Sequence, residues 1–183
     1  MTSMHTFAIY VEDQPGVLNR VASLFRRRGV NIHSLAVGPS ETPGVSRMTT
    51  VVRADTGGAL RIRAHLQKLV PVLRVEDITQ RSSLARELAL IKVTADHASR
   101  SPLMQLAQVF AARVVDVAPD SVVLEMTASP SRIDALLEVL RPHGVVELAR
   151  TGQIAMTRGT VLDPAVQGAA FERETEAGIS YSV

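Results

Sequence analysis

The sequence contains no cysteine and no tryptophan, and aromatic residues make up only 3% of its 183 positions. Without cysteine, disulfides, thiolate metal ligands and cysteine nucleophiles are excluded. Few aromatic rings argue against an RNA-binding sheet, which stacks bases on such side chains; the expected strands carry only Phe7 and Tyr10. No run of about 18 apolar residues is present, so no membrane partner is expected.

Sequence signatures of catalysis and of metal binding are missing as well. No two of the five histidines are three or four positions apart, so a helical metal site is not expected. Neither a Gly-x-Ser-x-Gly elbow nor a Walker-type phosphate loop occurs. The net charge of +2 is too small to indicate a nucleic-acid partner. Met1–Thr6 has no basic segment leading into an apolar run, so the expected location is the cytoplasm.

What the chain does have is alternating hydrophobic and helical patterns in a recognisable order. Hydrophobic residues make up 46% of the sequence, enough for a core. The first half predicts strand, helix, strand, strand, helix, strand, which is the ferredoxin-like order. The four expected strands are 6–11, 30–37, 47–53 and 72–78, with helices after Pro15-Gly16 and after Gly57-Gly58.

The second half repeats this order. It predicts a strand at 88–95, a helix at 101–113, a strand pair at 114–117 and 121–127, a helix at 131–140 and one or more closing strands within 145–156. The expected fold is therefore α+β, with two tandem ferredoxin-like units. The predicted divisions are a first domain at 1–79, a linker at 80–87, a second domain at 88–159 and a flexible tail at 160–183. Units this small are marginal alone, which favours an oligomer.

The turn between the first strand and first helix is the strongest candidate site. Asp13-Gln14-Pro15-Gly16-Val17-Leu18 places Gly16 at the start of a helix, where unpaired backbone N–H groups can hold a carboxylate. Glycine lets a ligand approach the backbone, and Asp13 could cap the helix or accept a ligand ammonium. The same residues are also compatible with nothing more than a good helix start.

Asn31 lies just after the helix stop and opens the second strand, which this topology places at a sheet edge. Two copies joined along that edge would bring Asn31 of one toward the Asp13–Leu18 turn of the other. Its amide suits the two charges of a zwitterion, and Val17, Leu18 and Ile32 would surround an aliphatic side chain. Turn chemistry alone also explains an asparagine here.

Several stretches, in order along both halves, resemble the small regulatory subunit of acetohydroxyacid synthase (acetolactate synthase), a family of ACT-domain proteins. The matching segments lie at 11–21, 24–38, 46–49, 66–69, 86–93, 115–117, 136–140, 150–152 and 156–159. The departures are His33, where an acidic residue is frequent in the family, and the segment after Gly159, which is longer than in many members.

The resemblance implies a protein that is not itself an enzyme. Thiamine diphosphate, Mg²⁺ and FAD would belong to a separate catalytic large subunit, and this chain would bind no cofactor. It would form a homodimer through its ACT domains and confer feedback inhibition by valine or another branched-chain amino acid. The effector would contact Asp13, Gly16, Val17 and Leu18 of one protomer and Asn31 and Ile32 of the other. The alternatives are a stand-alone double-ACT amino-acid sensor acting on transcription or another pathway, and an enzyme in its own right.

Overall fold

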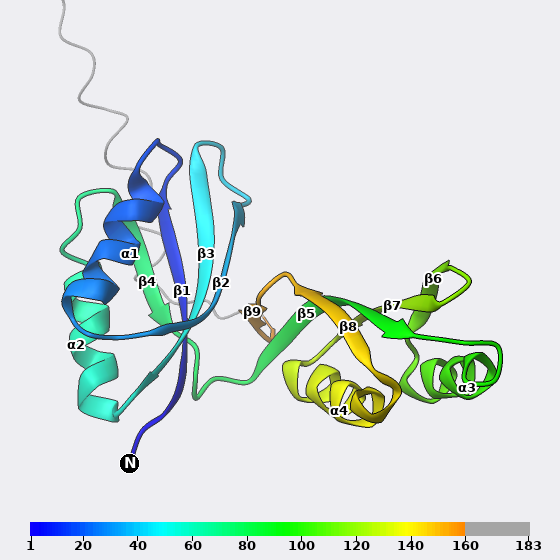
Figure 1. Ribbon diagram of the computed structural model, residues 1–183. Helices are drawn as coiled ribbons and strands as arrows, with labels where there is room; N and C mark the ends of the chain where they lie inside the picture. Colours follow the sequence, from blue (N-terminus) through cyan, green and yellow to red (C-terminus); the bar gives the residue numbers. More distant parts are fainter. Residues whose placement is uncertain (160–183) are drawn as a thin grey trace, which may run out of the picture.

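The computed structural model describes residues 1–159, which form two α+β units (Figure 1). The first unit contains β1 (Ser3–Glu12), α1 (Val17–Arg27), β2 (Ile32–Pro39), β3 (Val45–Ala54), α2 (Thr56–Leu66) and β4 (Val72–Asp77). The second contains β5 (Ser83–Thr94), α3 (Arg100–Phe110), β6 (Arg113–Val117), β7 (Ser121–Ala128), α4 (Pro130–Leu140), a short 3₁₀ helix (Arg141–His143), β8 (Val145–Arg150) and β9 (Ile154–Thr157).

Both sheets confirm the predicted ferredoxin-like arrangement. The first has the strand order β2-β3-β1-β4, and the second has the order β6-β7-β5-β8. In each, the first and third strands of the unit lie in the centre and all pairs are antiparallel. Strand β2 therefore lies at the edge of its sheet, as the topology predicted. None of the helices in the described part is long and apolar enough to cross a membrane.

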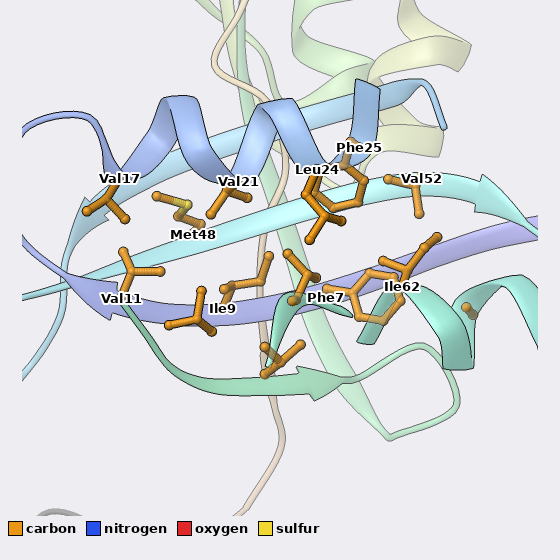
Figure 2. Close-up of a cluster of buried hydrophobic side chains, with 14 of the residues drawn as sticks. Phe7, Ile9, Val11, Val17, Val21, Leu24, Phe25, Met48, Val52 and Ile62 are labelled. Carbon is orange, nitrogen blue, oxygen red and sulfur yellow. The ribbon is translucent and has the colours of Figure 1, made fainter. Parts of the chain in front are cut away.

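Helices α1 and α2 cover one face of the first sheet (Figure 1). Alternate residues of β1 point to this face because side chains in a strand change sides at every position. Figure 2 shows Phe7, Ile9 and Val11 of β1 directed toward Val17 and Val21 of α1. Each fully buried side chain of this kind stabilises the fold by roughly 1.5–3 kcal/mol.

The two ends of α1 follow from its sequence. Gly16 at the N-cap has φ 84°, a left-handed conformation that glycine adopts without a steric penalty. Arg26 and Arg27 occupy the last turn, where positive charge complements the helix dipole. Gly29, at φ 64°, then ends the helix and turns the chain toward β2. The helix stop expected just before Asn31 is thus confirmed.

Strand β5 begins five residues earlier than predicted, which changes the segment expected to be a linker at 80–87. Its first part, Ser83–Arg86, pairs with β9, while Glu87–Thr94 pairs with β7 and β8. Most of the expected linker is therefore strand, because β9 returns to pair with it. The tail predicted at 160–183 lies outside the described residues.

The ribbon formed by β9 and the start of β5 lies against the face of the first sheet that the helices leave open. The Arg47 guanidinium of β3 donates to the backbone carbonyl of Ala155 in β9, and Ala155 itself is buried. Met156 borders the same cavity, of about 380 Å³, as Tyr10 and Arg74, which stack on each other with the guanidinium 3.9 Å from the ring centre. Thus β9 joins the two units.

Candidate functional site

The turn between β1 and α1 is held in place by neighbouring backbone. The Glu12 amide donates to the Pro71 carbonyl at 2.9 Å, and the Asp13 amide donates to the Gly44 carbonyl at 2.8 Å. The Asp13 carboxylate accepts a hydrogen bond from the Ser46 hydroxyl at 3.1 Å. Asp13 is therefore tied to the start of β3, and its side chain does not cap α1.

The N-terminus of α1 has no side-chain cap, and no acidic residue lies in its first turn. The Val17 amide donates to the Gln14 carbonyl at 3.3 Å. The Leu18 and Asn19 amides that follow leave a partial positive charge at this exposed helix end. Among the described residues, no heavy atom outside those adjoining Gly16 lies within 4 Å of the position that its Cβ would occupy. The helix end is open to a small anionic group such as a carboxylate.

The two apolar residues that follow Gly16 are placed differently. Val17 is 4% exposed, and its side chain packs in the core and anchors the turn there. Leu18 is 44% exposed and lies on the outer side of the first turn. Of these two predicted residues, only Leu18 offers its side chain to a ligand.

Asn31 and Ile32 lie beyond the other end of α1. Asn31 is exposed, while Ile32 is half-buried and packs against the core at the start of β2. An α-helix rises 1.5 Å per residue, so the 11 residues of α1 separate this pair from Gly16 by roughly 16 Å. A single chain does not bring the two halves of the predicted site together.

The outer edge of β2 provides the means of joining them. Within residues 1–159, no strand pairs with this edge, which leaves the strand available to pair with another chain. Strand β2 starts near the C-terminal end of α1 and runs alongside the helix back toward the β1–α1 turn. Pro39, at the end of β2, is level with Ser46 and Val11, whereas Ile32 is level with Val52 and His5.

The part of this site that sequence reasoning missed is the support for Asp13. Ser46 is buried and comes from β3, 33 positions away in the sequence. Nothing local to the turn indicates this partner, because it is brought there by the pairing of β1 with β3. In the described part of the chain, no group of three or more His, Asp or Glu side chains is placed to hold a metal ion.

Comparisons with known proteins agree across both units. Residues 7–74 match the family model described as the AHAS small subunit-like ACT domain. Residues 86–159 match the model described as the small subunit of acetolactate synthase.

Individual relatives cover nearly the same span. The chain is 46% identical over 157 residues to a probable acetolactate synthase small subunit of Methanothermobacter thermautotrophicus, covering 85% of this chain and 94% of the relative. It is 45% identical over 158 residues to the acetolactate synthase small subunit of Mycolicibacterium smegmatis, covering 86% and 93%. The solved acetolactate synthase small subunit of Thermotoga maritima superimposes with a TM-score of 0.79 at 37% identity, covering 87% of this chain and 99% of that one.

Proposed function

The chain belongs to the acetolactate synthase small-subunit family, and we propose that it serves as the non-catalytic regulatory subunit of that enzyme. In this proposal a separate catalytic subunit carries thiamine diphosphate, Mg²⁺ and FAD and makes acetolactate. This chain binds valine or another branched-chain amino acid and changes the activity of that partner.

The observation that carries the effector proposal is the uncapped N-terminus of α1 together with the outer edge of β2, with which no strand of residues 1–159 pairs. The backbone N–H groups after Gly16 would receive the effector carboxylate. Leu18, exposed at the first turn, would contact its aliphatic side chain. The remaining polar partner, Asn31, has to come from a second protomer, because in its own chain it lies at the far end of α1.

Antiparallel pairing of two β2 edges supplies that partner. Pro39 lies at the level of the turn, so Asn31 of the second protomer reaches the turn when it is level with Pro39. Both positions are equally far from Leu35, and the two-fold axis of such a dimer would pass at Leu35. A homodimer with this register holds two equivalent effector sites, each built from both protomers.

Regulation then follows from a difference in affinity. An effector that bridges two protomers stabilises the dimer geometry in which both halves of the site fit it best. The catalytic subunit responds only because it also prefers one of those geometries, and this coupling is reciprocal.

Gly16→Asp tests the site. Aspartate tolerates the left-handed conformation better than most residues, but it puts a negative charge where the effector carboxylate would bind. Calorimetry on the full chain should show that valine affinity falls below detection, while the reconstituted holoenzyme still makes acetolactate faster than the catalytic subunit alone. The matched control is Gly159→Asp, at φ 70° with open space around it, which should bind valine normally.

Asn31→Ala tests the contribution of the second protomer. Loss of hydrogen bonds to a charged group costs about 1.5–3 kcal/mol, so valine affinity should fall by roughly 10- to 100-fold. Leucine and isoleucine, titrated in parallel, identify the preferred effector. Unchanged affinity for all three in both Gly16→Asp and Asn31→Ala would contradict the site. Failure of the chain to associate with, or to change the rate of, its acetolactate synthase catalytic subunit would contradict the regulatory role.

A further inference from the structure

The segment Thr151–Gln153, between β8 and β9, lies directly on β2 of the first unit. The Gln153 amide donates to the Ser34 hydroxyl at 2.7 Å. Gly152 has φ 84°, and a Cβ added to it would lie 2.7 Å from the Leu35 carbonyl oxygen and 3.2 Å from the Ser34 hydroxyl oxygen. We call Thr151–Gln153 the coupling loop. Only glycine at its centre permits this approach to the backbone of β2.

The coupling loop is fixed at both ends. Immediately before it, the Arg150 guanidinium makes a paired hydrogen bond to the buried Glu87 carboxylate and another to Asp134 at 2.7 Å. At its first residue, the Thr151 amide donates to the Leu88 carbonyl at 3.1 Å. Two positions after it, the Ala155 carbonyl accepts from Arg47 of β3. The loop is thus anchored to the second sheet and lies against the first.

The contact lies at one particular place on β2. The two-fold axis of the proposed dimer would pass at Leu35, and Ser34 is the adjacent residue. Ser34 is level with Val51 and Thr6, and its side chain points to the helix-free face that the β9 ribbon covers. In that dimer the coupling loops of both protomers would lie next to each other on the same side of the joined sheet.

From this geometry we propose that the coupling loop transmits the effector-dependent dimer geometry from β2 to the second unit. This role rests on the dimer and effector site proposed above, and it describes how effector binding there would reach the second unit. A change in the twist or register of the two β2 strands moves the Leu35 carbonyl. Because the close approach of Gly152 leaves no free space, the loop has to move with it. Through Arg150 and Glu87 this movement reaches the core strands of the second sheet.

The substitution Gly152→Ala tests the inference. The added methyl group would meet a backbone carbonyl in a left-handed conformation, so the loop must lift from β2. Valine affinity of the full chain should stay within about threefold of the unmodified protein, while the valine concentration that half-inhibits the holoenzyme rises about tenfold or more, the size of a typical coupling energy. The control Gly159→Ala, also left-handed but in open space, should change neither value.

Hydrogen exchange on the full chain supplies a second readout that needs no catalytic subunit and no strained variant. Valine should slow amide exchange both in the Asp13–Leu18 turn and in residues 151–157. In Ser34→Ala, which removes the 2.7 Å hydrogen bond, protection of the turn should persist and protection of residues 151–157 should be lost.

The outcomes separate the two proposals. Protection of the turn without protection of residues 151–157 in the unmodified chain would overturn the coupling role and leave the effector site standing. Unchanged valine inhibition in Gly152→Ala, with unchanged exchange in Ser34→Ala, would do the same. Absence of valine protection at the turn itself would overturn the proposed function.

Discussion

Among the charged groups of the second unit, we expect removal of the Arg150 guanidinium to lower the free energy of unfolding the most. Glu87 is only 7% exposed. Its carboxylate accepts a hydrogen bond from Nε of Arg150 at 3.0 Å and a second one from another nitrogen of the same guanidinium. These hydrogen bonds to Glu87 are the main reason that the pKa of Arg150 is raised above its ordinary value. Substitution by methionine keeps much of the side-chain length but leaves a buried carboxylate without its partner.

The magnitude follows from the burial of the pair. Removing one partner of a fully buried ion pair costs about 3–5 kcal/mol. The Arg150 side chain is 26% exposed, so water can partly replace it, and we expect a loss of about 2–3 kcal/mol for Arg150→Met. The third partner, Asp134, is 58% exposed and adds little. Glu87→Gln, which keeps the shape and removes the charge, should cost less, about 1–2 kcal/mol.

Urea unfolding of the full chain, followed by a probe in the second unit, measures these free energies. The double variant Glu87→Gln/Arg150→Met should lose less stability than the sum of the two single variants, because the two side chains interact. Arg113→Met is the control: Arg113 is 78% exposed and lies 3.5 Å from Glu125, so its loss should cost less than about 1 kcal/mol. If Arg150→Met costs no more than Arg113→Met, the buried-pair reasoning is wrong.

Two further predictions concern the helices. The pKa of Asp96 is lowered mainly by the hydrogen bond from the Ser99 hydroxyl, so Ser99→Ala should raise that pKa in an NMR titration. A lowered pKa gives its full stabilisation above the unfolded-state pKa of about 4, and this stabilisation is lost as the pH falls through the folded pKa. The stability difference between the two proteins should therefore shrink over that pH range. Phe25→Ala, at 1% exposure, should cost about 3–5 kcal/mol in urea unfolding, whereas Leu60→Ala, at 63% exposure, should cost less than about 0.5 kcal/mol.

Local sequence patterns were sufficient for most of the fold because each helix and strand has one clear apolar face. The alternation in β1 and the 3.6-residue spacing in α1 predict apolar faces that meet in the same core. The start of β5 was not predicted. Residues Ser83–Arg86 become a strand only because β9 pairs with them, and a pairing between residues more than 60 positions apart leaves no periodic signal in either segment.

In the candidate site, too, some features follow from the local sequence and others depend on residues that are distant in the sequence. The sequence around Gly16 indicates a backbone that a ligand can approach, yet the φ of 84° at this residue requires tolerance of the left-handed region whether or not a ligand binds. A glycine in such a turn therefore has two independent explanations, and only a substitution that separates charge from conformation can distinguish them. At Gly152, by contrast, the reason for the glycine is a contact with the other unit. It was part of the matching segment 150–152, but its role could not be seen there, since the carbonyl that excludes a side chain belongs to Leu35 in the other unit. The sequence can therefore indicate that a glycine is required, and the reason for the requirement depends on which distant backbone the fold places against it.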